Sequence, residues 1–347
     1  MTTRTERQKL IRLLFHEGIP RLWCPLLTHY KNDGSIDYPR MKAHYSHLVP
    51  WIKGFLMPGS TGDGWELDHE ETMQVMNFGI RMAREKNTRV LLGVLKPDTD
   101  GMKQTIDDML NMMLTMTGTE DVLSRLRESH VCGFTICPPT GESLDQAVIL
   151  KEISRILDLG LPTALYQLPQ VTHNEASPEI FSALVEKYPH LLFFKDSSGN
   201  DRIALSDVDP DGVYMARGAE GDYAQWVKDA DGRYDGFLLS TANCFPSQLM
   251  NIIKYLEAKD LDGATKLSDR ISGVISKAFE AVRNVPCGNA FTNANKAIDH
   301  FCAFGPTAIR EKGPMLHGRI RLSTETLSKT ADILSSYDLM PTRGYLE

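Results

Sequence analysis

The sequence lacks the features that mark metal-binding, membrane and nucleic-acid-binding proteins. Its six cysteines show no metal-ligand spacing, and its ten histidines form no His-Glu-x-x-His zinc motif. No apolar run approaches the length that is needed to span a bilayer. The net charge is -7 and the basic residues are scattered, whereas a phosphate backbone is bound by clustered Lys and Arg. We therefore expect no metal, no nucleic acid and no membrane among the partners of this chain.

The cysteines and the N-terminus bear on the cellular compartment. Cys24, Cys132 and Cys137 lie in or beside apolar runs, where a reduced cysteine behaves as a small hydrophobic residue. Residues 1–15 are basic and partly amphipathic, but they contain no continuous apolar stretch and make a poor secretory signal. We expect a cytoplasmic protein.

What the sequence does contain is a series of short apolar runs. With 347 residues, of which 42% are hydrophobic, the chain can form one large barrel domain with an appendage, or two ordinary domains. The runs do not alternate apolar with polar residues, which is typical of strands buried on both faces in a parallel sheet. Eight such runs lie at 21–28, 54–59, 90–95, 133–139, 162–169, 191–198, 212–218 and 236–243.

Helix-like segments separate these runs. Residues 68–86, 143–160 and 177–188 are amphipathic, and Asp68 followed by Glu71 predicts an N-cap with an acidic first turn. Eight strands that alternate with helices are what a (β/α)8 TIM barrel requires. The alternative is an open doubly wound sheet, which usually carries a Gly-rich phosphate turn after its first strand; this chain has none there.

Two segments depart from this rhythm. Residues 101–130 are longer than one crossover helix requires and rich in Met, which we interpret as a core-facing or interface helix rather than a lid over a ligand. After the eighth run, residues 246–284 and 323–336 read as helices with no strands between them. We therefore expect a catalytic (β/α)8 barrel over 1–258 and a small C-terminal helical region over 259–347.

The fold rule selects Lys195 as a candidate nucleophile. In this fold the active site lies at the C-terminal ends of the strands, and Lys195 closes the sixth run after four apolar residues. Such a position is partly desolvated, which disfavours the ammonium form and lowers the pKa of the amine. A neutral amine is the form that attacks a carbonyl. The alternative for Lys195 is a solvated strand terminus.

Two further candidates lie at the ends of other runs. Tyr166, one strand away from Lys195, would relay a proton, or would serve only as a barrel tyrosine with a local hydrogen bond. The segment 59–64, Gly-Ser-Thr-Gly-Asp-Gly, is either a tight glycine turn or a nest for a carboxylate. In the second interpretation Ser60 and Thr61 donate hydrogen bonds to the acid group of a 2-keto acid.

In order and spacing, these residues resemble the dihydrodipicolinate synthase and N-acetylneuraminate lyase family of class I, Schiff-base-forming aldolases. The likeness runs from about Ile19 to about residue 302 and covers most of the chain. The motifs that carry it are GSTGD (59–63), YQLP (166–169), FKDSSG (194–199) and GFLLSTAN (236–243). Their combination is specific, whereas any one of them alone is not.

The resemblance implies a lyase, an aldolase or a dehydratase, that acts on pyruvate, a 2-keto-3-deoxy sugar acid or a related 2-keto acid. Lys195 would form the imine, and Tyr166 would move protons. The substrate-binding residues that it implies are Gly59, Ser60, Thr61 and Leu238. It also implies a homo-oligomer, a dimer or tetramer, and no cofactor beyond the covalent lysine imine.

Two positions differ from those of dihydrodipicolinate synthases. Val171 stands where those enzymes have an arginine that binds the carboxylate of the second substrate, and Thr140 lies in the stretch that matches their second tyrosine. Valine cannot replace a bidentate carboxylate partner. A dihydrodipicolinate synthase that condenses pyruvate with aspartate semialdehyde is therefore the alternative enzyme, and a non-catalytic keto-acid-binding barrel is the alternative outside enzymes.

Overall fold

The computed structural model describes residues 2–347 and is built around a closed barrel of eight parallel strands. Each strand pairs with the next one along the chain, and β8 pairs with β1 to close the ring. The strands are β1 (Leu22–Pro25), β2 (Gly54–Met57), β3 (Arg89–Gly93), β4 (Val131–Ile136), β5 (Thr163–Gln167), β6 (Leu191–Asp196), β7 (Tyr214–Arg217) and β8 (Gly236–Leu238). Every predicted run overlaps one of these strands, which confirms the (β/α)8 barrel.

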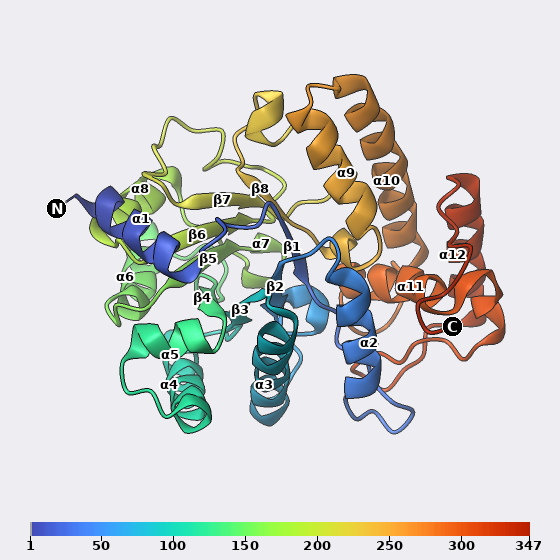
Figure 1. The fold of residues 1–347 in the computed structure, drawn as a ribbon, viewed down its shortest axis with the longest axis horizontal. Coiled ribbons are helices and arrows are strands. Elements are labelled where there is room, and N and C mark those ends of the chain that lie inside the picture. The colour runs from blue at the N-terminus through green and yellow to red at the C-terminus, as the bar shows by residue number, and fades with distance from the viewer. Residues whose placement is uncertain (1) are drawn as a thin grey trace.

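Helices surround the barrel and extend it on one side. They are α1 (Thr3–Leu14), α2 (Tyr38–Leu48), α3 (His69–Lys86), α4 (Thr99–Thr117), α5 (Val122–Glu128), α6 (Gln146–Leu157), α7 (Pro169–Thr172), α8 (Pro178–Lys187), α9 (Pro246–Glu257), α10 (Leu261–Ala281), α11 (Ala290–Phe304) and α12 (Thr324–Ser336). In Figure 1, α9 to α12 gather at the side of the barrel opposite to α1 and the N-terminus.

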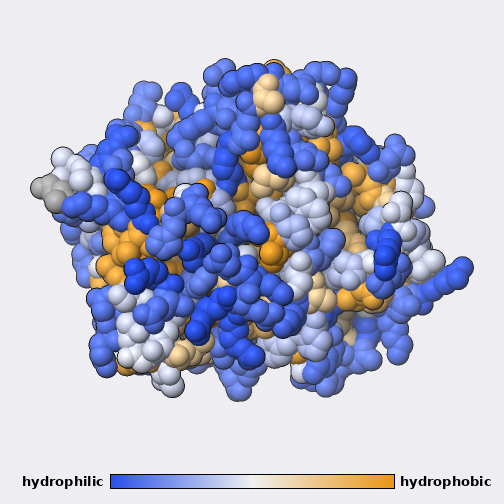
Figure 2. Space-filling model, viewed as in Figure 1, coloured by the Kyte–Doolittle hydropathy of each residue, from blue (hydrophilic) through white to orange (hydrophobic). Residues whose placement is uncertain are grey.

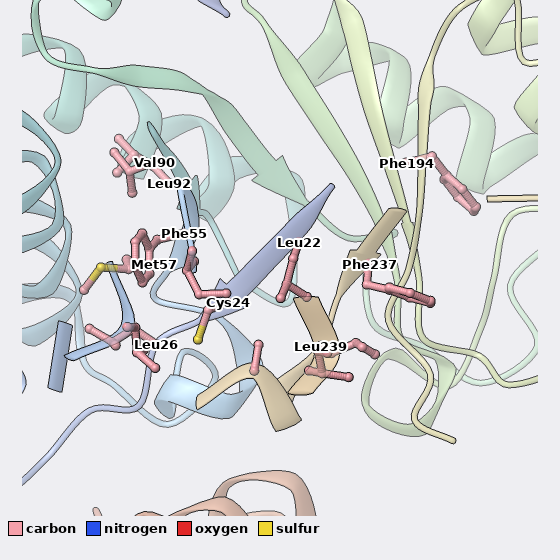
Figure 3. Close-up of a cluster of buried hydrophobic side chains, with 14 of the residues drawn as sticks. Leu22, Cys24, Leu26, Phe55, Met57, Val90, Leu92, Phe194, Phe237 and Leu239 are labelled. Atoms are coloured by element: carbon pink, nitrogen blue, oxygen red, sulfur yellow. The ribbon is translucent and has the colours of Figure 1, made fainter. Parts of the chain in front are cut away.

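The strand side chains alternate between the barrel interior and the layer of helices. On β2, Leu56 belongs to a cluster inside the barrel, whereas Phe55 and Met57 pack in a larger cluster between strands and helices. Figure 3 shows part of this outer cluster on several neighbouring strands. Because both faces of each strand are buried, both sets of positions are apolar, and the sequence shows runs rather than alternation.

Helix α1 closes the N-terminal end of the barrel. Leu14 and Phe15 pack into the interior cluster, where the ring of Phe15 meets Trp23 edge-on at 6.2 Å between centroids. The buried guanidinium of Arg7 donates a hydrogen bond of 2.9 Å to the carbonyl of Leu191 on β6. This end of the barrel is therefore filled with side chains, and the opening lies at the C-terminal ends of the strands.

Helix α3 begins where the sequence predicts. Asp68 accepts a hydrogen bond from the Glu71 amide at 2.8 Å, and the Glu71 carboxylate accepts one from the Asp68 amide at 3.1 Å. This capping box satisfies two amides that would otherwise lack partners at the helix end.

The Met-rich segment 101–130 forms two helices, α4 and α5, on the outside of the barrel. Met102, Met109 and Met113 are buried in the outer cluster. The predicted core-facing role is confirmed, and the second helix accounts for the extra length.

The C-terminal region contains one helix that the sequence did not predict. The predicted helix over 246–284 is two helices, α9 and α10, and α12 is found over the predicted 323–336. Helix α11 lies between α10 and α12 and is buried from Thr292 through Ala303. It packs against η1 (Ser60–Gly62) and η3 (Ser240–Asn243), the 3-10 turns that follow β2 and β8.

A buried ion pair joins α11 to the turn after β2. The Lys296 ammonium lies 2.7 Å from the Asp63 carboxylate, and their side chains are 0% and 1% exposed. The Tyr30 hydroxyl donates a second hydrogen bond to Asp63 at 2.9 Å. The φ of Asp63 is 60°, in the left-handed region that ends the turn. The pair therefore holds the GSTGDG loop against the C-terminal region.

The face of the molecule drawn in Figure 2 is mainly polar. In Figure 2, hydrophilic residues cover most of the face in view, and apolar residues gather in smaller patches. Within residues 2–347 there is no helix with both the length and the apolar character to cross a membrane.

Removing one partner of the buried ion pair is expected to destabilise the fold. Lys296→Met leaves the Asp63 carboxylate buried without its cation, which costs about 3–5 kcal/mol. Equilibrium unfolding in urea measures the loss.

The control is Lys329→Met on α12, because Lys329 forms an exposed pair with Glu325 at 2.7 Å. An exposed pair contributes at most about 1 kcal/mol. Equal losses in the two variants would contradict the anchoring role of Lys296.

Candidate active site

Strand register brings Tyr166 and Lys195 together. Tyr166 on β5 is the register partner of Lys195 on β6. Two residues earlier on each strand, Ala164 and Phe193 point into the barrel interior. Because side chains two apart on a strand share a face, Tyr166 and Lys195 also point inward, one layer nearer the opening.

The Lys195 amine is desolvated. Its side chain is buried, and Nζ lies 3.8 Å from the centroid of the Tyr166 ring. The structure places no carboxylate of residues 2–347 in an ion pair with this amine. Burial lowers the pKa of Lys195 to about 7, against smaller opposing effects of Cys137 and Glu220. A large share of the molecules therefore carries a neutral, nucleophilic amine at neutral pH.

The Tyr166 phenol is a buried proton donor. Burial raises its pKa, Cys137 adds to the rise, and a hydrogen bond with Ser197 opposes it. The hydroxyl therefore keeps its proton at neutral pH, within one strand of the amine. A neutral phenol next to a neutral amine can donate a proton to an oxygen on a substrate held at the amine.

Hydroxyl groups line the cavity on the other side of Lys195. They belong to Ser60, Thr61, Ser197 and Ser240 at the ends of β2, β6 and β8. The Ser60 Oγ is buried and has no hydrogen-bond partner among the described residues. An unpaired buried hydroxyl is costly, and an acceptor on a bound molecule would satisfy it. This side of the cavity therefore suits a carboxylate.

The start of α11 holds the Ser60–Thr61 turn in place. The Thr292 hydroxyl donates to the carbonyl of Thr61 at 3.0 Å, and the Asn289 side-chain amide donates to the carbonyl of Ser60 at 3.2 Å. Phe291 from the same helix lines the cavity. The C-terminal region thus supplies part of the site.

The loop after β7 forms the remaining side of the cavity. The Glu220 carboxylate accepts hydrogen bonds from the hydroxyls of Ser240 at 2.5 Å and Thr241 at 2.6 Å. Arg217 donates to the loop carbonyls of Ala219 and Gly221 at 2.9 and 3.1 Å. These contacts set the position of the loop that passes over the Lys195 side chain.

Gly218 begins that loop at the closest approach to Lys195. A Cβ at Gly218 would lie 2.2 Å from the Ser197 Oγ and 2.7 Å from the Lys195 Cε. Both distances are shorter than atoms tolerate, so only glycine fits here without displacing the reactive side chain.

The side of the cavity beyond Tyr166 is apolar. Leu168 lines the cavity, and it packs with Leu95, Cys137 and Tyr166, against which Trp65 and Val171 also pack. The free volume at Lys195 is about 10 Å³, room for about one water molecule. Side chains at the opening must therefore shift when a substrate enters.

The predicted site residues divide into two groups. Ser60, Thr61, Tyr166 and Lys195 line one cavity. Leu238 lies below it in the barrel interior cluster, and Gly59 is the residue before the Ser60 turn; neither lines the cavity. Their roles in substrate binding stay predictions.

Sequence reasoning missed five lining residues. They are Leu168, Ser197, Gly218, Ser240 and Phe291. Ser197 and Ser240 lie in the quoted motifs at the ends of their strands, so the fold rule already offered them. Phe291 carried no signal, because helix α11 was not predicted.

One group of residues offers metal-type ligand atoms close together. It consists of His29, His44 and Asp299, all buried beside α11. The His44 ring contacts His29 at 3.1 Å and the Asn243 carbonyl at 2.9 Å, and Asp299 pairs with Arg40 at 2.7 Å. The group therefore satisfies its own hydrogen bonds and ties α11 to α2.

Charge in this group is balanced internally. Burial alone would raise the pKa of Asp299, but His44, Arg40 and His29 outweigh it and lower that pKa. The Asp299 carboxylate is therefore ionised and paired with Arg40, as a buried charge in a structural role must be.

Comparison with known proteins finds similarity to one family. The model of the dihydrodipicolinate synthetase family matches residues 134–293. The 4-hydroxy-tetrahydrodipicolinate synthase of Methanosphaerula palustris is 22% identical over 320 residues, which cover 90% of this chain and 97% of that enzyme. The chain is therefore similar to the dihydrodipicolinate synthetase family, in agreement with the resemblance seen in its motifs. The matched segment of the family model includes Tyr166 and Lys195.

Solved structures share the fold. A prophage protein of this family from E. coli K12, in complex with pyruvate, superposes with a TM-score of 0.71 and 16% identity over 92% of this chain and 99% of its own. A 2-keto-3-deoxygluconate aldolase variant from Sulfolobus solfataricus, in complex with L-2-keto, 3-deoxy-galactonate, gives 0.69 and 16% over 92% and 96%.

A methyl group at position 218 is expected to lower the reactivity of the Lys195 amine toward a carbonyl. Gly218→Ala displaces the Lys195 side chain, and a misplacement of about 1 Å can slow a reaction in a protein site by about 100-fold. The measurement is the rate of reductive methylation of Lys195 by formaldehyde, read by peptide mass spectrometry.

Gly101→Ala on α4 is the matched control, because the nearest atom to its added Cβ is 3.4 Å away. An unchanged rate in Gly218→Ala, equal to that of the control, would show that the loop does not constrain Lys195.

Proposed function

We propose that this protein is a class I lyase, an aldolase or dehydratase, that binds pyruvate or a related 2-keto acid as an imine on Lys195. The observation that carries the proposal is the buried amine of Lys195, with a pKa of about 7, beside the protonated phenol of Tyr166. The unpaired hydroxyl of Ser60 in the same cavity supports a carboxylate-bearing substrate.

The first step is formation of the imine. The neutral Lys195 amine attacks the keto carbon, and the keto oxygen leaves as water after it gains two protons in all. Tyr166 supplies one proton to this oxygen and the amine supplies the other, so the second amine proton stays on nitrogen and the product is a protonated imine next to a Tyr166 phenolate. The substrate carboxylate accepts hydrogen bonds from Ser60 and Thr61 on the opposite side of the cavity.

The second step breaks or forms a carbon–carbon bond. In cleavage of a 4-hydroxy-2-keto acid, the bond between C3 and C4 breaks and its electron pair moves to the protonated imine, which becomes an enamine. Tyr166, now a phenolate, takes the C4 hydroxyl proton as the aldehyde leaves. Protonation of C3 and hydrolysis by one water then release pyruvate and restore the amine.

Known relatives support this chemistry. The similar proteins include 4-hydroxy-tetrahydrodipicolinate synthases, a 2-keto-3-deoxygluconate aldolase and a protein of the dihydrodipicolinic acid synthase family in complex with pyruvate. The imine itself serves as the electron sink, so the proposed reaction requires no metal and no organic cofactor. In dehydration of a 2-keto-3-deoxy sugar acid, the protonated imine would instead lose a C3 proton to the Tyr166 phenolate to give an enamine. The C4–O bond would then break, and the C4 hydroxyl would leave as water with that proton.

The setting of the enzyme is part of the proposal. Six free cysteines, five of them buried, suit a cytoplasmic compartment, where thiols stay reduced. A homo-oligomer, a dimer or tetramer, follows from the family resemblance.

Two residues disfavour the dihydrodipicolinate synthase alternative. Val171 belongs to the apolar side of the opening, and Thr140 donates its hydroxyl to the Pro97 carbonyl at 3.2 Å. Neither offers the charged partner that a second carboxylate needs.

Borohydride trapping tests the proposal. Incubation with pyruvate, reduction and peptide mapping should give a pyruvate adduct on Lys195. Lys195→Ala should abolish both the adduct and turnover, because within residues 2–347 no second lysine lines the cavity. Lys187→Ala, which removes an exposed lysine, is the control.

An adduct that is absent with pyruvate and with a panel of larger 2-keto acids would overturn the proposal. Persistent turnover in Lys195→Ala would do the same.

A further inference from the structure

The cavity around Lys195 has two chemically different sides. Its hydroxyl groups come from the ends of β2, β6 and β8, as described above. A separate apolar cluster next to Tyr166 is formed by residues at the ends of β3, β4 and β5, in the loop after β2 and on α7. We call these residues the apolar wall: Trp65, Leu95, Cys137, Leu168 and Val171.

The apolar wall is only partly enclosed by the rest of the protein. Leu95, Cys137 and Leu168 are buried, whereas Trp65 and Val171 are only partly buried. The wall forms a cluster separate from both the barrel interior and the layer beneath the helices. It is in contact with the reactive centre, because Tyr166 belongs to it and Leu168 lines the cavity that contains Lys195.

Polar side chains next to the wall are engaged elsewhere. The Lys96 amine lies 3.3 Å from the Thr72 hydroxyl of α3. The Gln170 amide donates to the Ser197 carbonyl at 3.1 Å. Among the lining residues that the structure describes there is no arginine and no carboxylate, and Lys195 is the one cation. The Trp65 indole N–H is buried without a hydrogen-bond partner among the described residues and is a neutral donor within the wall. A charged group placed against this wall would lose its hydration without gaining an ionic partner.

We propose that the apolar wall binds the alkyl or aryl substituent of the aldehyde substrate. In the 4-hydroxy-2-keto acid the same group is the substituent on C4. This inference rests on the proposed function. With the keto-acid carboxylate at Ser60 and C2 at Lys195, the substituent on C4 extends past Tyr166 toward the wall. The reaction then joins C3 of pyruvate to the carbonyl carbon of an apolar aldehyde, and Tyr166 gives its proton to the aldehyde oxygen.

Aldehyde preference tests the inference in the condensation direction. Purified enzyme and pyruvate are combined with butanal, benzaldehyde, D-glyceraldehyde or succinic semialdehyde, and the 4-hydroxy-2-keto acid products are quantified. We expect kcat/KM to favour butanal or benzaldehyde by at least about tenfold, since even one methylene in an apolar pocket can be worth 10–200-fold.

Substitutions at Val171 locate the effect. Val171→Thr keeps the shape and adds a hydroxyl, and Val171→Arg adds a cation at the wall. Both should lower kcat/KM for the apolar aldehydes by about tenfold. Val171→Arg should also raise it for succinic semialdehyde, because the guanidinium can pair with the carboxylate. Val148→Arg, which changes an exposed valine on α6, is the matched control and should leave the preference unchanged.

The outcomes separate this inference from the proposed function. If pyruvate is trapped on Lys195 but kcat/KM for D-glyceraldehyde or succinic semialdehyde equals that for the apolar aldehydes, the wall does not set specificity and this inference is overturned. If pyruvate is not trapped, the proposed function fails and the inference fails with it. Trapping together with an apolar preference that Val171→Arg reverses would support both.

Discussion

The loss of solvent around the Lys195 amine is the constraint on which the site depends. Burial lowers the pKa of this amine to about 7 by penalising the ammonium form. The Glu220 carboxylate opposes that effect less strongly than burial acts, because the cavity lining itself presents hydroxyls, apolar side chains and the Tyr166 ring. The same burial keeps the Tyr166 phenol protonated. One physical effect thus sets both a nucleophile and a proton donor.

The position of these two groups follows from strand geometry. Alternation along β5 and β6 turns Tyr166 and Lys195 toward the barrel axis, and their register makes them neighbours. Below them the barrel is filled with apolar side chains and closed by α1. The reactive layer is therefore the last one before the opening, where the fold leaves room for a substrate.

Helix α11 makes the C-terminal region part of the catalytic unit. It pairs Lys296 with Asp63, donates to the Ser60–Thr61 turn through Thr292, and contributes Phe291 to the cavity. Outside α11, the GSTGDG loop is held by hydrogen bonds from the Tyr30 hydroxyl to Asp63 and from the Thr28 hydroxyl to the Gly62 carbonyl. A buried ion pair specifies one arrangement because each charge needs the other.

Much of this could be predicted from the sequence, and the remainder has physical reasons. Uninterrupted apolar runs located all eight strands, and Lys195 and Tyr166 followed from the rule that sites lie at strand ends. Helix α11 could not be read from periodicity, because it is buried nearly all round and contains polar residues such as Asn295 and Asp299 that pair internally. Phe291 was missed for the same reason.

The sequence indicated the apolar wall only through one position that differs from the dihydrodipicolinate synthases. Val171 was recognised as unlike the family's arginine, but its neighbours Trp65, Leu95 and Cys137 come from three separate loops and strand ends. Their contact is a property of barrel closure, which places the ends of adjacent strands around one opening.

The most direct test of the central claim is a titration of the Lys195 amine. Competitive labelling with acetic anhydride across a range of pH, read by mass spectrometry of the Lys195 peptide, reports the fraction of neutral amine. The account predicts that labelling of Lys195 rises with a midpoint near pH 7, where its pKa lies, while the exposed Lys187 titrates several units higher. A midpoint for Lys195 near the ordinary lysine value of about 10.4 would contradict it.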